Sequence, residues 1–217
     1  MIKAFVFDIG HTLVSYNNPI NWKALYEPAL QCVFRECGIA ETAARMASAM
    51  AVLTKYNTRE NPREVEVTSD VILGEIFDAW KAQSSLMSTA KRAFYGFFRA
   101  DAVCYSDAAE TLRQLHSHGL KTAALTDVAY GMDNEFALND IVELRELLDA
   151  ALTSTDVGYR KPHAAGFLRL ATVLGVAPSE MAYVGDERKD IDGANAVGTT
   201  SILNQTRRRD ARLGTGA

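Results

Sequence analysis

The sequence predicts an α/β fold in which a parallel sheet has helices on both faces and an all-helical subdomain is inserted near the amino-terminal end. Two observations lead to this prediction. From Ser106 onward, short apolar runs alternate with segments of helical periodicity, which is typical of a parallel sheet whose strands are connected by helices. Between residues 15 and 102, in contrast, no convincing strand pattern occurs and helical periodicity dominates.

The composition is that of a globular protein, with 217 residues of which 48% are hydrophobic and 23% charged. A net charge of −4 argues against a general nucleic-acid binder, because phosphate affinity needs a basic surface. No apolar stretch is long enough to span a membrane, and the amino terminus becomes polar too quickly for a signal peptide. The three cysteines lack zinc-ligand spacing, so we expect reduced thiols in a cytoplasmic protein. The sequence leaves the oligomeric state open.

The first expected strand is Ala4–Phe7, an apolar run that ends at Asp8. Apolar residues then recur at helical spacing from Trp22 until Gly38, which supplies a helix stop. Similar periodicity predicts three more helices in this block, over residues 42–56, 69–83 and 88–99. A loop is expected over residues 57–67, which contain an Asn-Pro pair.

The second half of the chain alternates between helices and strands. Asp107 and Glu110 have the spacing of a capping box for a helix that ends at Gly119. Another helix has Pro162 in its first turn and ends at Gly175. Buried strands are expected over residues 120–125, 150–153, 181–184 and 200–203, with a helix over 190–197. The final segment, 207–217, is predicted to be a flexible basic tail.

Polar residues follow three of the predicted strands, at the edge where open α/β sheets bind their ligands. Asp8 follows the first strand, Thr126 and Asp127 follow the strand over 120–125, and Asp186 with Asp190 follows the strand over 181–184. One lysine, Lys161, precedes a predicted helix near the same edge. Singly, each residue has a structural explanation, since an aspartate after a strand often only forms a turn or caps a helix. Their convergence on one edge favours a functional site.

The chemistry of such an edge is well defined. Several converging carboxylates repel one another unless a cation compensates them, and oxygen-only ligands favour Mg²⁺ over zinc. A carboxylate that stays ionised beside the metal can attack phosphorus and form an aspartyl-phosphate. The Lys161 ammonium and the Thr126 hydroxyl can then stabilise the phosphoryl oxygens.

Four segments of the chain resemble, in order, the four motifs of the haloacid dehalogenase superfamily: FVFDIGHTL, LKTAALTD, GYRKP and YVGDERKDIDGANAVG. The resemblance implies a Rossmann-like catalytic core, here residues 1–14 and 102–206, with a helical cap over residues 15–101. It also implies a Mg²⁺-dependent phosphatase that acts on a small phosphorylated metabolite through an aspartyl nucleophile.

The same resemblance implies roles for individual residues. Asp8 is the expected nucleophile and binds Mg²⁺ together with Asp186 and the backbone carbonyl of Gly10. Thr126 and Lys161 are expected to bind the phosphoryl group. Two further aspartates have supporting roles: Asp190 supports the metal site directly or through water, and Asp127 contributes its backbone N–H to the substrate.

The sequence departs from the superfamily pattern at Gly10, where phosphatases usually carry a second aspartate that acts as a general acid and base. The next residue, His11, has an unperturbed pKa of about 6.5 and could supply the proton instead; it could equally cap the turn. Without a proton donor, we expect activated phosphoesters to be preferred over alkyl phosphates, since general acid catalysis matters least for good leaving groups.

Other functions remain open at this stage. A dehalogenase or phosphonatase of the same superfamily is one alternative, with Lys23 and Lys55 as candidate Schiff-base lysines by location only. A catalytically weak binding or regulatory protein is another, and the glycine at position 10 favours it. Four residues just beyond the first motif could face the substrate, although each could equally be structural: Asn17, Asn18, Trp22 and Tyr26.

Overall fold

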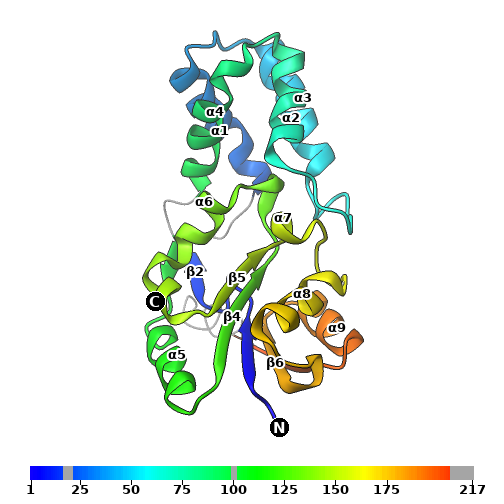
Figure 1. Ribbon diagram of the computed structural model, residues 1–217. Helices are drawn as coiled ribbons and strands as arrows, with labels where there is room; N and C mark the ends of the chain where they lie inside the picture. Colours follow the sequence, from blue (N-terminus) through cyan, green and yellow to red (C-terminus); the bar gives the residue numbers. More distant parts are fainter. Residues whose placement is uncertain (17–21, 99–101, 206–217) are drawn as a thin grey trace, which may run out of the picture.

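The computed structural model describes residues 1–16, 22–98 and 102–205, and it has two parts arranged end to end. An α/β part holds both ends of the described chain, and a bundle of four helices extends from it (Figure 1). The predicted substrate-facing residues Asn17 and Asn18, the Trp22 side chain and the predicted tail over 207–217 lie outside what the structure describes. None of the described helices combines the length and apolar character needed to cross a membrane.

The main sheet confirms the predicted fold class. Its five parallel strands run in the order β5-β4-β1-β6-β7. Their bounds are Ala4–Phe7 (β1), Lys121–Thr126 (β4), Ala150–Thr153 (β5), Met181–Gly185 (β6) and Thr200–Leu203 (β7). In the central strand, Phe7 is aligned with Ala124 of β4 and Val184 of β6. The carboxyl ends of these three strands therefore meet at one edge, which faces the helical bundle (Figure 1).

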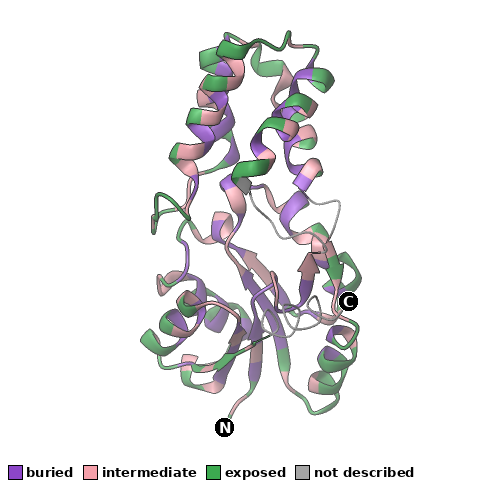
Figure 2. Cartoon of the chain, turned by 180° about the vertical axis from the view of Figure 1, so that it is seen from behind, coloured by how far each residue is buried: buried purple, intermediate pink, exposed green. Residues whose placement is uncertain are grey.

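Helices cover both faces of this sheet, and the strands between them are mostly buried (Figure 2). On one face, α5 (Ala108–Ser117) and the 3₁₀ segment η3 (Leu138–Leu147) pack through Leu112, Ile141 and Leu144. On the other, α8 (Ala165–Leu174) and α9 (Arg188–Ala196) pack against β4 and β6 in a second apolar cluster. Short helical turns complete this part: α7 (Ser154–Val157) and η4 (Pro178–Glu180).

The helical bundle comprises α1 (Trp22–Cys37), α2 (Ala43–Tyr56), α3 (Ser69–Trp80), the turn η1 (Ser84–Leu86) and α4 (Met87–Phe98). Its apolar centre includes Phe34 and Trp80, whose ring centroids are 4.6 Å apart. The segment that follows β4, containing η2 (Ala129–Gly131) and α6 (Asn134–Ala137), contributes Tyr130 and Phe136 to the same cluster. The bundle is thus packed onto the α/β part through a shared apolar core.

A small antiparallel ribbon joins the two parts, and the sequence did not predict it. Strand β2 (Val14–Tyr16) pairs with β3 (Ala102–Cys104) on either side of the inserted bundle. Each strand has three residues, which is too short to show the alternation on which strand prediction depends.

Two local expectations were wrong. Pro162 does not lie in a first helical turn, because α8 begins only at Ala165. Asp107 lies at the amino-terminal end of α5, but its side chain makes no capping hydrogen bond. A reciprocal capping box occurs instead at the start of α7, where the side chains of Thr153 and Asp156 accept each other's backbone N–H groups.

Candidate active site

A cavity of about 900 Å³ lies between the carboxyl edge of the sheet and the helical bundle. Six residues that the sequence singled out line it from the sheet side: Asp8, Gly10, His11, Thr126, Asp127 and Asp186. Lys161 lines it as well, while Tyr56 at the end of α2, residues 57–60 and Arg63 line it from the bundle side. The structure therefore brings the predicted residues together around one space.

Asp8 is fixed directly beyond β1, where its backbone N–H donates to the Val184 carbonyl at 2.8 Å. Its side chain is buried, and the Lys161 ammonium lies 2.9 Å from Oδ1. Burial raises the pKa of the Asp8 carboxyl, Lys161 opposes this shift, and the Asp190 carboxylate adds to it. Further positive charge at this position would hold Asp8 ionised.

Lys161 contacts several polar groups of the site at once. Its ammonium lies 2.6 Å from Asp190 Oδ1 and donates to the Tyr183 hydroxyl at 2.9 Å and the Leu125 carbonyl at 3.3 Å. Burial alone would lower the pKa of Lys161, but the Asp8 carboxylate, Tyr183 and Asp190 outweigh it and raise that pKa well above its usual value. Lys161 therefore carries a fixed positive charge that is aimed at Asp8.

Asp190 is completely buried, and each of its carboxylate oxygens has a partner. One oxygen pairs with Lys161, and the other accepts the Glu187 backbone N–H at 2.9 Å. This arrangement requires the glycine before the turn, because a β-carbon on Gly185 would come within 2.5 Å of the Asp190 side chain. Gly185 is thus required by the packing of Asp190 as well as by the turn.

Asp8, Asp186 and Asp190 form a candidate metal centre. One carboxylate oxygen from each residue lies within 4.8 Å of the other two. The donor set contains oxygen alone, which suits a hard divalent cation. Because Asp190 already serves Lys161 and the start of α9, Asp8 and Asp186 are the better placed of the three to bind an ion directly.

Thr126 ends β4 and Asp127 follows it, both at the edge of the cavity. Asp127 Oδ1 accepts the backbone N–H of Lys161 at 3.0 Å, and Oδ2 lies 2.9 Å from the Lys189 ammonium. Burial would raise the pKa of Asp127, but the surrounding cations, Lys161 and Lys189 foremost, lower it instead. The carboxylate is therefore ionised and paired, which reduces the repulsion that it would otherwise exert on a bound phosphate.

Gly10 and His11 form the turn after Asp8. His11 has a left-handed backbone conformation, with φ of 55°, and its ring packs edge-on against Tyr16 with 5.4 Å between centroids. His11 and Tyr16 both line the cavity.

Sequence reasoning missed the contacts that tie the bundle to this site. Glu66, whose side chain is 1% exposed, forms an ion pair with Arg160 and accepts a hydrogen bond from Ser154 at 2.5 Å. Val65 and Tyr159 form an antiparallel bridge beside this pair. Nearer the cavity, Arg59 lies 2.5 Å from Glu187. No periodic pattern marks such contacts, because they join a loop to residues 88 or more positions away.

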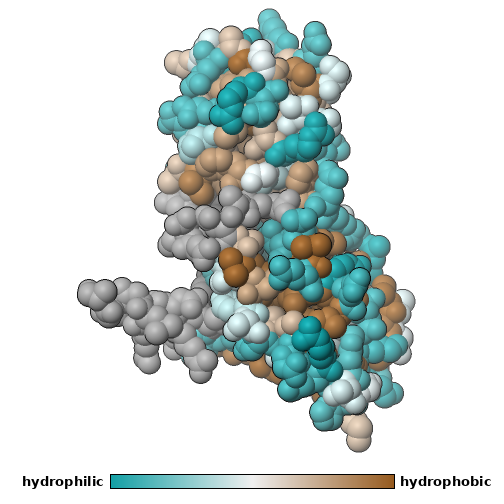
Figure 3. All heavy atoms as spheres, turned by 90° about the vertical axis from the view of Figure 1, so that its left-hand side faces the viewer, coloured by the Kyte–Doolittle hydropathy of each residue, from teal (hydrophilic) through white to brown (hydrophobic). Residues whose placement is uncertain are grey.

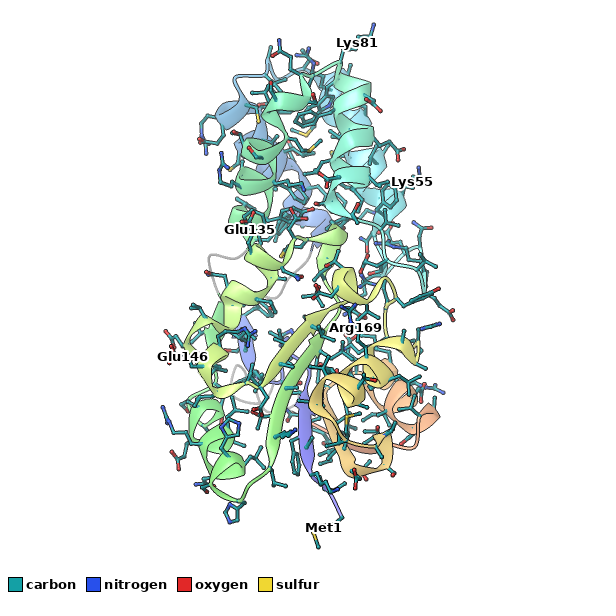
Figure 4. All side chains as sticks on the ribbon, viewed as in Figure 1. Met1, Lys55, Lys81, Glu135, Glu146 and Arg169 are labelled. Atoms are coloured by element: carbon teal, nitrogen blue, oxygen red, sulfur yellow. The ribbon has the colours of Figure 1, made fainter. Side chains whose placement is uncertain are left out.

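The remaining candidates differ in position. Lys23 lines the cavity and lies 2.9 Å from Glu60. Lys55 pairs with Glu75 on the outer face of the bundle, where Figure 4 shows its side chain pointing away from the molecule. Tyr26 is buried inside the bundle, where its hydroxyl contacts Asn57 and Tyr130. Of these three, only Lys23 reaches the cavity.

Comparisons with known proteins agree with this arrangement. The model of the haloacid dehalogenase-like hydrolase family matches residues 2–198. The glyceraldehyde 3-phosphate phosphatase of Methanopyrus kandleri is 28% identical over 211 residues, covering 93% of this chain and 83% of that protein. The phosphoglycolate phosphatase of Salmonella typhimurium is 31% identical over 102 residues, which are 46% of this chain but only 39% of that protein.

Solved structures show the same fold. The 2-haloacid dehalogenase from Pseudomonas syringae pv. Tomato superposes with a TM-score of 0.65 at 20% identity, covering 94% of this chain and 86% of that one. The haloacid dehalogenase-type phosphatase from Thermococcus onnurineus has a TM-score of 0.59 at 22% identity, with coverages of 93% and 86%. At these identities the likeness shows the fold alone.

Proposed function

The chain belongs to the haloacid dehalogenase-like hydrolase family, and we propose that it is a Mg²⁺-dependent phosphatase acting on a small phosphorylated metabolite. The observation that carries this proposal is the placement of Lys161 2.9 Å from Asp8, next to a group of three carboxylates. A nucleophile, a fixed cation and a set of oxygen ligands are what phosphoryl transfer to a carboxylate needs.

The residues present fit a divalent cation. Asp8 and Asp186 would hold it together with the backbone carbonyl of Gly10, while Asp190 would support the site through Lys161. When bound, Mg²⁺ would neutralise negative charge shared between the carboxylates and the substrate phosphate. The raised pKa of Asp8 supports this fit, because Lys161 alone does not fully compensate the burial of the carboxylate.

The chain's own residues divide the reaction between them. Asp8 attacks phosphorus as the bond to the leaving oxygen breaks, which forms an aspartyl-phosphate and releases the alcohol after it gains a proton. Lys161 and the Thr126 hydroxyl hold the phosphoryl oxygens and stabilise the charge that develops on them. Water then attacks phosphorus, releases inorganic phosphate and restores Asp8.

The charges around the cavity favour an uncharged leaving group. Among the described residues that line the cavity, every lysine and arginine has a carboxylate within 4.0 Å: Lys23, Arg59, Arg63, Arg160, Lys161 and Lys189. A substrate carboxylate or second phosphate would have to displace one of these partners. Glyceraldehyde 3-phosphate, named for the Methanopyrus kandleri relative, has an uncharged leaving group, whereas phosphoglycolate carries a carboxylate. We therefore favour substrates of the first kind.

The test is hydrolysis of an aryl phosphate by the purified protein with Mg²⁺ and with excess chelator, compared with the Asp8→Asn variant. The proposal predicts turnover that needs both the metal and Asp8. Turnover that persists in Asp8→Asn, or that is unchanged by excess chelator, would contradict the proposal.

A further inference from the structure

We propose that Tyr16, positioned by Asp140, is the proton donor to the leaving group. This inference rests on the proposed phosphatase function and concerns the same cavity. It answers a chemical requirement that the residues described so far leave open: the oxygen that departs from phosphorus needs a proton unless it is already a stable anion.

The fold of the first motif brings Tyr16 to the site. After Asp8 the chain turns back on itself, with the N–H groups of Leu13 and Val14 both donating to the Ile9 carbonyl, at 2.9 and 3.0 Å. Strand β2 then returns beside the turn. Because side chains alternate along a strand, the buried Val14 and the partly buried Tyr16 lie on the same face.

Tyr16 lies next to the space left open by the glycine at position 10. A β-carbon on Gly10 would lie 3.8 Å from the Tyr16 ring and 3.9 Å from its hydroxyl oxygen. Both residues line the cavity together with Asp8. The phenol oxygen is therefore within reach of the region that a side chain at position 10 would occupy. Position 10 is two residues after the nucleophile Asp8.

The surroundings of Tyr16 suit a donor. Its hydroxyl donates to Asp140 Oδ2 at 3.4 Å, which is long for an O–H···O hydrogen bond and leaves the hydroxyl able to turn towards a substrate. The His11 ring packs edge-on against Tyr16 and further limits its orientation.

Two other donors on the sheet side of the cavity, Lys161 and the Thr126 hydroxyl, are less suitable. Lys161 holds its proton firmly between Asp8 and Asp190, and its charge is needed at the phosphoryl group. The Thr126 hydroxyl is about as weak an acid as the departing alcohol, so it can donate a hydrogen bond but gains nothing by giving up its proton. A phenol is intrinsically a stronger acid than an alkyl alcohol, so its proton can pass to a departing alkoxide even though burial and the nearby carboxylates raise the pKa of Tyr16.

The transfer is balanced over the two steps. In the first, the electron pair of the breaking P–O bond goes to the leaving oxygen, which takes the proton of Tyr16. In the second, the water that attacks phosphorus gives a proton to the Tyr16 phenolate. Each cycle thus ends with Tyr16 protonated and Asp8 free.

The experiment measures kcat/KM with Mg²⁺ for a series of phosphoesters, from nitrophenyl phosphate to simple alkyl phosphates. Tyr16→Phe removes the hydroxyl and keeps the ring. Tyr159→Phe is the matched control, because Tyr159 is exposed and stacks on His163 away from the cavity. We expect Tyr16→Phe to lower alkyl phosphate turnover by about 10²-fold or more, to change nitrophenyl phosphate turnover much less, and so to steepen the dependence on leaving-group pKa. Asp140→Asn should shift that dependence in the same direction by a smaller amount.

A second variant keeps the inference testable if Tyr16→Phe also perturbs the turn. Adding Gly10→Asp to Tyr16→Phe introduces a carboxyl group at position 10, where Tyr16 is the described residue that a new β-carbon would contact, at an ordinary distance. We expect the double variant to regain alkyl phosphate turnover.

Three results would overturn the inference. These are an equal loss for all substrates in Tyr16→Phe, an unchanged dependence in that variant, and a steepened dependence in His11→Ala but not in Tyr16→Phe. The proposed function would fail differently, because native protein would then hydrolyse none of the phosphoesters.

Discussion

The two walls of the cavity are built on different principles. On the sheet side, Asp8, Lys161 and Asp190 have side chains that are 10% exposed or less, and Lys161 pairs with both carboxylates. On the bundle side, Lys23 and Arg59 are 60% and 69% exposed, and each pairs with one carboxylate near the surface. Buried charges cannot change partners without a large cost, whereas exposed ones exchange with water. The sheet wall is therefore suited to fixed chemistry, and the bundle wall to the choice of substrate.

The largest effect should come from the buried wall. Lys161→Ala should lower kcat/KM by about 10²-fold or more, on the scale of one lost transition-state contact. It should also lower the free energy of unfolding by about 3–5 kcal/mol in the absence of metal, because Asp8 and Asp190 lose their shared counter-charge.

Steady-state kinetics and urea unfolding measure these two losses. The comparison variant on the opposite wall is Lys23→Ala, which should change kcat/KM by less than about tenfold because its ion pair is exposed. Equal losses in the two variants would remove the distinction between the walls.

A second prediction concerns the attachment of the bundle. Glu66→Ala leaves Arg160 buried without its carboxylate partner and removes the acceptor of the Ser154 hydroxyl. We expect the free energy of unfolding to fall by about 3 kcal/mol. Limited proteolysis should also cut faster within residues 57–67. If Glu66→Ala unfolds at the native urea midpoint, the buried pair does not hold the two parts together.

The pH dependence of stability tests the other attachment point. Lys91 lies 2.8 Å from both Asp70 and Asp133, and Asp133 belongs to the segment that follows β4. Burial would lower the pKa of Lys91, but these carboxylates raise it above its usual value of 10.5. A raised lysine pKa stabilises the folded state below the unfolded pKa, and this stabilisation is lost as pH rises through the folded pKa.

Lys91→Met should accordingly be less stable than native protein at pH 7, by about 1 kcal/mol, since the pair is partly solvated. The difference should shrink as pH rises above 10.5. Urea unfolding of both proteins at neutral and alkaline pH gives the comparison. A difference that stays constant would mean that Lys91 acts through packing alone.

The smallest effect is expected on the outer face of the bundle. Figure 4 places Lys55 on the right-hand side of the bundle, away from the face that Figure 3 shows, where hydrophilic residues lie between apolar patches. Lys55 and Glu75 form an exposed pair, with 57% and 39% of their side chains accessible. Lys55→Ala should leave both the melting temperature and kcat/KM unchanged. A measurable loss of activity would instead implicate this face in the reaction.

The contrast between the walls also explains what the sequence could reveal. Asp8 and Asp186 each follow a strand and Thr126 ends one. Strands of a parallel sheet end at a common edge, so the convergence of these residues was predictable from local pattern. Lys161 was predictable from its place before a helix near the same edge and from its motif. Its support by the Tyr183 hydroxyl was not, because a tyrosine within a buried strand looks like any other core residue.

On the bundle side of the cavity, the sequence predicts the helices but not how they are attached. Its helices α1–α4 follow from apolar periodicity, but the way they dock depends on Glu66, on Arg160 and on the apolar residues that follow β4. These contacts join positions distant in the chain, and nothing in the local sequence around them differs from a solvated loop. The proximity of Tyr16 to Gly10 could not be predicted for a related reason, since it depends on how tightly the chain turns back after Asp8.

The most direct test of the account is to find where the phosphoryl group goes. Native protein is mixed with a phosphoester and Mg²⁺, quenched in acid within one turnover, digested and analysed by mass spectrometry, with Asp8→Asn treated in parallel. The account predicts one added phosphoryl group on the peptide that contains Asp8, localised to that residue and absent from Asp8→Asn. A phosphoryl group on any other residue, or one that persists in Asp8→Asn, would contradict it.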